Sequence, residues 1–405
     1  MIKHYLNSFA FLDQQIKALP EKELNMVIVI PSRIESSLID SLQSVLDADL
    51  PEKPYEVIVV FNHPLGESSD NKAENERLFN ECSKWIDQRE IKNIHLIKAF
   101  DLPDKHAGVG LARKVGMDEA LWRFGSNERG IIVALDADCK VNKNYLRAIE
   151  KAFALAPDCN AASIYFQHST IGLKEPLLSG IVNYELHLRY YNQLLKYSGH
   201  PYAYHTVGSS MAVRASAYYK QGGMNKRKAG EDFYFLQKLI QLGNFIEIKD
   251  AIVYPSARIS DRVPFGTGRA MGEWVDGNKI EFESYHPEVA EDLKHLFKLI
   301  KKEEPPLFSE LTESIGMFFG ESVWEAKMKE IEENTSTKEA FILRFFQWFN
   351  LFMCFKFVHF YRDNFKANIP VSQAASTLLK KLNVELNGNE TNLELLDKFR
   401  KREAS

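Results

Sequence analysis

The sequence predicts an α/β protein with a mostly parallel sheet flanked by helices, followed by a helical C-terminal domain. Apolar runs alternate with amphipathic segments between residues 26 and 166. Several of these runs are uninterrupted, which is typical of parallel strands that are covered on both faces. From about Trp274 onward the pattern is helical to the end of the chain. We therefore expect an N-terminal helical segment (1–25), an α/β domain (26–273) and a helical domain with a charged tail (274–405).

The elements of the α/β domain follow from local patterns. The expected strands are Met26–Ile30, Tyr55–Phe61, Ile94–Lys98, Ile131–Leu135 and Ala161–Phe166, followed later by Phe245–Ile248 and Ala251–Tyr254. The expected helices are an N-terminal one ending near Pro20, one carrying Leu38, Leu42 and Val45, and others over Ala107–Phe124, around Leu146–Phe153, over Pro176–Tyr197 and from Gly230 to Gly243. The polar stretch 66–75 is expected to be a loop.

Composition narrows the class of protein. The chain has 405 residues, 45% of them hydrophobic and 26% charged, and its net charge is -4. This balance gives no electrostatic case for a nucleic-acid partner, which would favour a basic surface. The four cysteines are widely spaced, and the N-terminus lacks the apolar centre of a signal peptide, so we expect a cytoplasmic protein with reduced thiols.

One aromatic segment, 341–361, could be mistaken for a membrane span. Its uninterrupted stretch between Arg344 and Lys356 is shorter than the ~20 apolar residues that a span needs. We expect a helix that packs against the α/β domain. The alternative is peripheral contact with the inner face of a membrane.

The most informative motif is Asp136-Ala137-Asp138, which directly follows the apolar strand 131–135. Ligands of open α/β sheets bind beyond the carboxyl ends of the strands. Paired carboxylates at that place are typical ligands of Mg²⁺ or Mn²⁺, which usually shares its shell with substrate phosphates. The alternative is a pair of residues that cap the next helix.

A second acidic motif, Gly230-Glu231-Asp232, precedes an apolar helical face. Carboxylates in a first helical turn interact favourably with the helix dipole, so simple capping explains the motif. The functional alternative is that Asp232 is a general base that accepts the proton of an attacking hydroxyl and is kept ionised by the dipole.

Taken together, the motifs resemble the inverting family 2 glycosyltransferases of the GT-A fold. The resemblance covers roughly residues 26–272 and rests on an ordered set: Pro31-Ser32-Arg33-Ile34-Glu35-Ser36, the Arg113 helix, Asp136-Ala137-Asp138, Val207-Gly208-Ser209-Ser210-Met211-Ala212-Val213-Arg214, Gly222-Gly223 and Gly230-Glu231-Asp232. It implies transfer of a sugar from a nucleotide diphosphate donor to a saccharide, lipid-linked or small-molecule hydroxyl acceptor. It also implies a divalent metal, Mn²⁺ or Mg²⁺, that bridges the diphosphate. The oligomeric state is not predicted.

The resemblance also implies site residues. The donor would contact Pro31, Ser32, Arg33, Glu35, Asn62, Arg113, Asp136 and Ala137, the metal would bind Asp136 and Asp138, Asp232 would be the base, and Glu231 would orient acceptor hydroxyls. Two departures stand out. The second strand ends in Phe61-Asn62-His63, where many members carry acidic residues that hold the nucleotide base. The late strand is followed by Pro255-Ser256-Ala257-Arg258, where many members offer a histidine to the metal.

The stretch 258–269 carries three arginines and two glycines. Arginine binds phosphate with a bidentate fork, and glycine lets the backbone flex as a lid. We expect Arg258 and Arg262 to contact the donor diphosphate or an anionic acceptor. The alternative is a solvated loop.

Three other functions are weighed against glycosyl transfer. A dinucleotide-binding oxidoreductase is rejected because Gly108-Val109-Gly110 follows a polar loop rather than the first strand. A nucleotidyltransferase would open with a glycine-rich loop where Pro31-Ser32-Arg33 stands. A non-catalytic protein of the same fold that binds sugar nucleotides or carbohydrate remains the alternative.

Overall fold

The structure is a computed structural model that describes residues 1–260, 266–277, 281–302 and 304–404. Its chain forms two compact units. The first unit contains Met1–Ser169 and Thr206–Arg269, and the second contains Thr170–His205 and Ala270–Ser405. The segment Thr170–His205, which we expected within the α/β domain, therefore clusters with the C-terminal helices.

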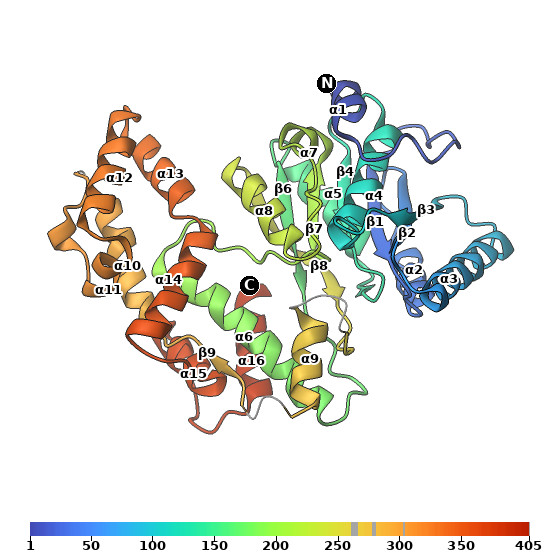
Figure 1. Ribbon diagram of the computed structural model, residues 1–405. Helices are drawn as coiled ribbons and strands as arrows, with labels where there is room; N and C mark the ends of the chain where they lie inside the picture. The colour runs from blue at the N-terminus through green and yellow to red at the C-terminus, as the bar shows by residue number, and fades with distance from the viewer. Residues whose placement is uncertain (261–265, 278–280, 303, 405) are drawn as a thin grey trace. The chain divides into compact units, whose positions relative to one another are not determined.

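The first unit is built on one eight-stranded sheet (Figure 1). Its strands are β1 (Met26–Ser32), β2 (Tyr55–Pro64), β3 (Ile94–Leu102), β4 (Ile131–Ala134), β5 (Lys140–Val141), β6 (Ala161–Phe166), β7 (Met211–Arg214) and β8 (Phe245–Tyr254). They lie in the order β3-β2-β1-β4-β7-β6-β8-β5. Strands β3, β2, β1 and β4 are mutually parallel, and β7 runs antiparallel to both of its neighbours. The predicted α/β class and mostly parallel sheet are confirmed.

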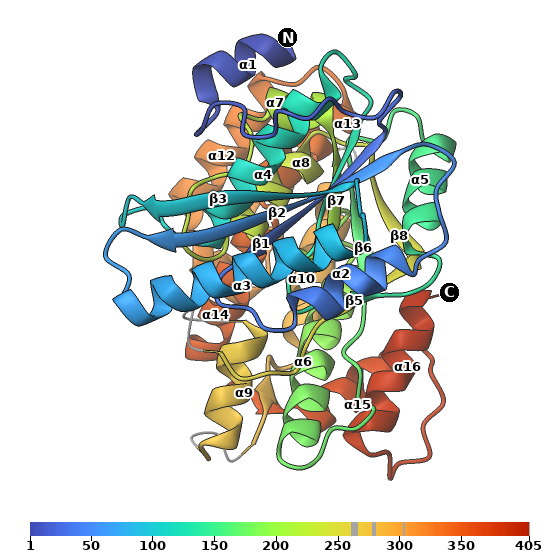
Figure 2. The ribbon, with the colours of Figure 1, turned by 90° about the vertical axis from the view of Figure 1, so that its right-hand side faces the viewer.

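Helices cover both faces of the parallel strands, which is why β1 and β4 are buried along their whole length. Helix α3 (Ser69–Gln88) packs on β2 and β3, and α4 (Val109–Phe124) packs on β1 and β2. Figure 2 shows α3 in front of these strands and α4 behind them. The other helices of this unit are α1 (Ile2–Phe9), α2 (Leu38–Leu46), α5 (Tyr145–Leu155), α7 (Ala215–Lys220) and α8 (Glu231–Gln241).

Two local expectations for this unit are wrong. The stretch 66–75 is not all loop, because α3 begins at Ser69 and the Ser68 hydroxyl accepts a hydrogen bond from the Asn71 amide at 3.3 Å. The polar start of α3 hid the helix, since most of its buried residues come only in its later turns. The two short strands expected over 245–254 form one continuous strand, β8.

The N-terminal helix is also shorter than expected, because α1 ends at Phe9. The residues after α1 are held by hydrogen bonds to two buried carboxylates of α4, those of Asp118 and Glu119. Asp118 accepts hydrogen bonds from the Tyr5 hydroxyl at 3.0 Å and the Phe11 amide at 3.2 Å. Glu119 accepts from the amides of Gln15 and Ile16 at 2.8 and 2.9 Å. The bonds from the Phe11, Gln15 and Ile16 amides satisfy backbone groups that a longer helix would have paired internally.

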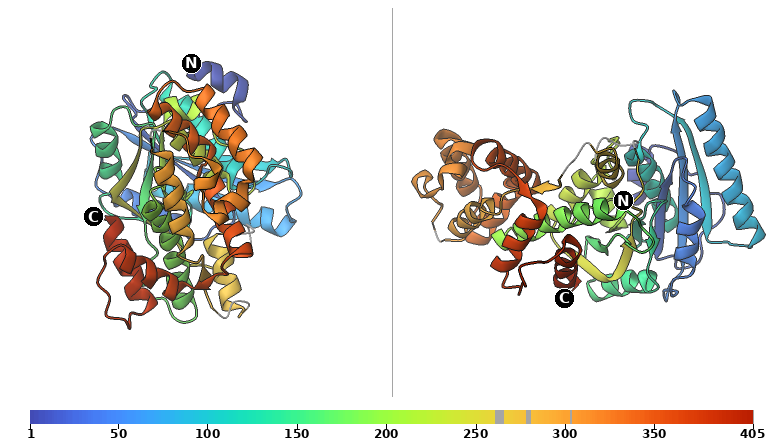
Figure 3. Two further views of the ribbon diagram at one scale, coloured as in Figure 1. Left: turned by 90° about the vertical axis from the view of Figure 1, so that its left-hand side faces the viewer. Right: turned by 90° about the horizontal axis from the view of Figure 1, so that it is seen from below.

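The second unit is helical (Figure 3). Its elements are α6 (Leu177–Ser198), α9 (Thr267–Val275, which begins in the first unit), α10 (Val289–Ile300), a 3₁₀ turn (Phe308–Glu310), α11 (Glu313–Phe319), α12 (Glu321–Glu333), α13 (Lys338–Trp348), α14 (Leu351–Asn364), α15 (Val371–Lys381) and α16 (Asn392–Ala404), with a small ladder of β9 (Glu283–Ser284) and β10 (Ile369–Pro370). Helix α6 is central to this unit and contacts α10, α15 and α16.

A buried charge network joins α6 to α16, and we call it the helix cluster: Glu185, Arg189, His205, Arg400 and Glu403. Arg189 donates to Glu185 at 2.8 Å and also to Glu403. Arg400 donates to both carboxylate oxygens of Glu185 at 2.8 Å. Burial alone would raise the pKa of Glu403, but His205, Arg189 and Gln193 outweigh it and lower that pKa to about 2. In this cluster, basic side chains contact both carboxylates.

The aromatic segment 341–361 is not the single helix that we expected. It divides into α13 and α14, which meet at an angle of 59°. The break occurs because the Asn350 side chain accepts hydrogen bonds from the Phe352 and Met353 amides and so starts a new helix. Within the described residues, no single helix has the length and apolar character of a membrane span, and only this bent pair passes when taken together.

Candidate functional site

The predicted site residues gather at the edge of the sheet where the parallel strands end. Pro31 and Ser32 close β1, and Arg33 and Glu35 follow it. Asn62 lies near the end of β2, and Asp136 and Asp138 follow β4. Because β1 pairs in parallel with both β2 and β4, these three strand ends are neighbours. This is the edge at which open α/β sheets bind ligands.

Arg113 of α4 joins two of the acidic motifs. Its guanidinium is buried, with 2% of the residue exposed, and donates hydrogen bonds to the carboxylates of Asp136 and Glu231. Asp232 is close enough to add to the charge attraction on Arg113. We call Arg113, Asp136, Glu231 and Asp232 the edge cluster. It brings α4, the end of β4 and the start of α8 together around one cation.

Close backbone approach makes room for this arrangement. A Cβ atom on Gly208 would lie 2.6 Å from Nη1 of Arg113, so only glycine leaves space for the guanidinium. Gly230 precedes α8 with a φ of 68°, a left-handed conformation that favours glycine. Steric constraints therefore explain why glycine stands at positions 208 and 230. Gly208 lies within the motif 207–214, from which no role for it is predicted.

The two acids at the start of α8 hold protons more tightly than free carboxylic acids do. Burial raises the pKa of Glu231 to about 7, with the Asp232 charge adding to the effect and Arg113 opposing it. Burial likewise raises the pKa of Asp232, although Arg113 and the hydrogen bond from the Phe233 amide oppose it. The expectation that the helix dipole keeps Asp232 ionised is therefore opposed by desolvation. A raised pKa suits a group that must accept a proton near neutral pH.

Asp138 lies in a second ion-paired group with Glu35 and Arg258. Nε of Arg258 is 2.8 Å from Oδ2 of Asp138, and its Nη2 is 2.7 Å from Oε2 of Glu35. Arg258 follows β8 and Glu35 follows β1, so the guanidinium links two strand ends to the Asp-x-Asp turn. Burial raises the pKa of Asp138, Asp136 adds to the effect, and Arg258 opposes it.

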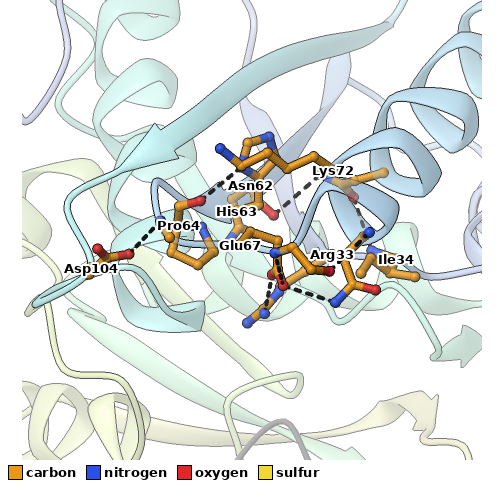
Figure 4. A network of polar contacts seen from close by, with 12 residues as sticks. Arg33, Ile34, Asn62, His63, Pro64, Glu67, Lys72 and Asp104 are labelled. Carbon is orange, nitrogen blue, oxygen red and sulfur yellow. Dashed lines mark hydrogen bonds and ion pairs between the residues drawn. The ribbon is translucent and has the colours of Figure 1, made fainter.

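A polar network surrounds the ends of β1 and β2 (Figure 4). Arg33 is paired with Glu67 of the loop before α3. The Ile34 amide donates to the Asn75 side chain at 3.0 Å, and that side chain donates in turn to the Asn62 carbonyl at 3.3 Å. His63 is stacked on Phe100, with ring centroids 4.5 Å apart. The network fixes the backbone beside Asn62 and places His63 in a structural role.

The structure thus brings most of the predicted residues to one edge of the sheet. Arg113 bridges Asp136 and Glu231 from a buried position, and its predicted contact with the donor stays a prediction. Ala137 is buried, as is the Ser32 hydroxyl, which finds no hydrogen-bond partner among the described residues. Arg262 lies outside the described residues. Sequence reasoning missed Glu67 as the partner of Arg33, because no local pattern pairs two residues 34 positions apart.

The residues at this edge, as they are arranged, do not fit a divalent cation. Asp136 is engaged by Arg113, and Asp138 is engaged by Arg258. In the described part of the chain, no group of three or more His, Cys, Asp or Glu residues is placed to hold a metal ion. A cation would have to displace a guanidinium to reach either carboxylate. The predicted Mn²⁺ or Mg²⁺ site stays a prediction that these contacts oppose.

Sequence comparison identifies no relatives: no protein-family model matches the chain, and no curated protein matches it. Comparison with solved structures finds weak likenesses. Staphylococcus aureus TarS aligns with 57% of this chain over 36% of its own length, at 13% identity and a TM-score of 0.35. The chain thus spans about a third of that protein.

Two other solved structures align over most of both chains. TarS 1–349 in complex with UDP-GlcNAc covers 91% of this chain and 98% of its own length, at 12% identity and a TM-score of 0.38. The mannosyltransferase PcManGT from Pyrobaculum calidifontis, in complex with GDP-Man and Mn²⁺, covers 94% of each chain at 14% identity and a TM-score of 0.39. Scores below 0.5 do not establish a shared fold.

Proposed function

We propose that this chain is a glycosyltransferase of the GT-A type, which moves a sugar from a nucleoside diphosphate donor to a hydroxyl acceptor with inversion. One observation carries the proposal. Arg113 gathers Asp136, at the ligand-binding edge of a parallel sheet, and Glu231, next to Asp232, into one buried cluster. These are residues of the separate motifs that resemble family 2 glycosyltransferases, and they come from positions 113, 136 and 231.

The proposed chemistry assigns the proton to Asp232. The acceptor oxygen attacks the anomeric carbon of the donor sugar while Asp232 accepts the hydroxyl proton. The bond from that carbon to the phosphate oxygen breaks, and the diphosphate leaves with the electron pair. Glu231 is only 3% exposed and is bonded to Arg113, which favours a positioning role for it. Its predicted contact with acceptor hydroxyls stays a prediction.

The proposed donor pocket lies beside this cluster. Its residues are Pro31, Ser32, Arg33, Glu35, Asn62, Ala137, Asp136 and Arg258. No step is assigned to a metal, because the carboxylates proposed to hold it are paired with arginines. The acceptor class, the membrane contact through 341–361 and the cytoplasmic location stay proposals that rest on the sequence.

The test separates donor binding from catalysis. UDP, GDP, ADP and CDP are titrated calorimetrically into the full chain, and turnover of the matching sugar donors, including UDP-GlcNAc and GDP-Man, is followed as nucleotide release. Asp232→Asn should lower turnover about 10²- to 10⁴-fold because the proton acceptor is lost. Nucleotide affinity should stay unchanged, since Asp232 is proposed to face the acceptor. Asp158→Asn, at an exposed position before β6, is the matched control.

Each outcome decides between the functions. Binding of one nucleotide together with turnover that depends on Asp232 supports the glycosyltransferase. Failure of every nucleotide to bind overturns it. Binding without turnover, with water or with saccharide and lipid-linked acceptors, identifies the alternative: a non-catalytic protein that binds sugar nucleotides.

A further inference from the structure

We infer that Arg258 takes the electrostatic place of a divalent cation, so that the chain binds the diphosphate of its donor without a metal ion. The inference rests on the proposed function, because it concerns the same donor site. It goes further in naming the group that neutralises the leaving diphosphate.

The position of Arg258 is the first argument. Its guanidinium lies 2.8 Å from Asp138 and 2.7 Å from Glu35, which joins the second acid of the Asp-x-Asp turn to the loop after β1. A metal ion at this place would use the same carboxylate oxygens. The positive charge between the two acids therefore belongs to a side chain, that of Arg258. Arg258 follows β8, where many family 2 glycosyltransferases offer a histidine to the metal and this sequence does not.

The charges around Asp138 support the same conclusion. Asp136 already shares the charge of Arg113, and the Glu35 side chain is only 5% exposed. Removing Arg258 would leave Asp138 and Glu35 as two neighbouring, largely buried carboxylates. Such a pair is costly without a positive charge between them. Arg258 thus supplies positive charge to both acids in the absence of a ligand.

The remaining donors of Arg258 can serve the ligand. A guanidinium has five N–H groups in a planar fork, and the two contacts involve only Nε and Nη2. The Arg258 side chain is 32% exposed, so part of the fork remains open to a phosphate oxygen. When the bond to the anomeric carbon breaks, the electron pair stays on the diphosphate. Arg258 then stabilises the added negative charge, while the acceptor proton passes to Asp232.

The experiment compares the wild-type chain with Arg258→Ala in two measurements. In the first, the nucleotide that binds best is titrated in EDTA and in Mn²⁺. Wild-type affinity should be the same within about twofold in both conditions. Arg258→Ala should lose about tenfold to a hundredfold in EDTA, as expected for a charged hydrogen-bond donor, and should regain affinity in Mn²⁺.

In the second measurement, Mn²⁺ alone is titrated and its free concentration is read by electron paramagnetic resonance. Arg258→Ala should bind Mn²⁺ at least tenfold more tightly than the wild type, because Asp138 and Glu35 are released. Adding Asp138→Asn to the variant should abolish the gain. Arg147→Ala, at an exposed position of α5, is the control, and circular dichroism checks that each variant folds.

Arg258→Lys keeps the positive charge but loses the planar set of N–H donors of the guanidinium. It replaces Arg258→Ala in the nucleotide titration if the alanine variant does not fold. It should still bind nucleotide in EDTA, but about tenfold more weakly than the wild type. The inference is overturned if wild-type nucleotide binding needs Mn²⁺, or if wild-type protein binds Mn²⁺ alone in a way that Asp138→Asn abolishes. Failure of all nucleotides to bind would instead overturn the proposed function, and the Mn²⁺ titration would still report on Arg258.

Discussion

Each unit of this chain contains a buried charge cluster among its described residues, and the edge cluster and the helix cluster are balanced differently. In the edge cluster, the three carboxyl groups of Asp136, Glu231 and Asp232 surround the single guanidinium of Arg113. In the helix cluster, the two carboxyl groups of Glu185 and Glu403 are matched by Arg189, Arg400 and His205.

The pKa values follow this difference. The pKa of Glu231 is raised to about 7, whereas that of Glu403 is lowered to about 2, although both side chains are largely buried. Burial acts in the same direction on both, so the number of neighbouring cations decides the outcome. The comparison links the raised carboxyl pKa of Glu231 to a shortage of neighbouring cations. In the helix cluster, the cations instead hold Glu403 ionised while they join α6 to α16.

A pH profile tests the comparison with the largest expected effect. A carboxyl group whose pKa is raised stays protonated to higher pH, and a protonated acid cannot act as a base. We therefore expect the turnover number to fall with falling pH, with an apparent pKa that belongs to the Glu231–Asp232 pair and lies above that of a free carboxylic acid. Glu231→Gln removes a neighbouring negative charge and should move this limb to lower pH. A wild-type limb near pH 4, the range of a free carboxylic acid, would contradict the raised pKa values of the edge cluster.

Glu403→Gln tests the other side of the comparison. Because the folded-state pKa of Glu403 is lowered from 4.5 to about 2, its ionised form stabilises the fold by about 3 kcal/mol above pH 4.5. That stabilisation is lost as the pH falls through this window, so the difference between wild type and variant should disappear near pH 2. Denaturant unfolding at a series of pH values measures it. Asp397→Asn, at an exposed position of α16, should cost less than about 1 kcal/mol.

The smallest effect is expected from Gly208→Ala, which sharpens the steric argument for the edge cluster. The new methyl group would meet Nη1 of Arg113 at 2.6 Å, so the guanidinium must move away from its carboxylates. We expect a loss of about 1–3 kcal/mol in the free energy of unfolding, together with lower turnover. Gly316→Ala in α11 is the contrast, because its Cβ would lie 3.4 Å from the nearest ring atom. That change should be neutral or stabilising, by up to about 1 kcal/mol, and equal losses in both variants would contradict the argument.

Much of the sheet could be predicted because buried parallel strands have a strong local signal. The expected strand Ala161–Phe166 has the same bounds as β6, and Met26–Ile30 lies within β1. Signals of other elements were weaker or misleading. The polar start of α3 resembled a loop, and the aromatic run 341–361 concealed the cap at Asn350. Helix α14 depends on the single capping side chain of Asn350, and helix α3 depends on packing that begins only in its later turns.

The site could be predicted as a set of residues but not as a set of contacts. The acidic motifs at 136–138 and 231–232 follow recognisable local patterns, so each was found. The bridge through Arg113 joins positions 118 residues apart, and the contact of Arg258 with Glu35 joins two strand ends. No spacing rule connects such positions. In the structure both aspartates are paired with an arginine, which opposes the predicted contact with a metal ion.

The anchoring of the N-terminal segment has a practical consequence for anyone who shortens this chain. Asp118 and Glu119 bind the residues after α1, and they lie on the same helix as Arg113. A form that begins at Met26 would retain the whole sheet, yet it would leave two buried carboxylates on α4 without those donors. Truncation there would disturb the helix that positions Arg113. The opening residues, distant from every acidic motif in sequence, are thus a condition for an intact edge cluster.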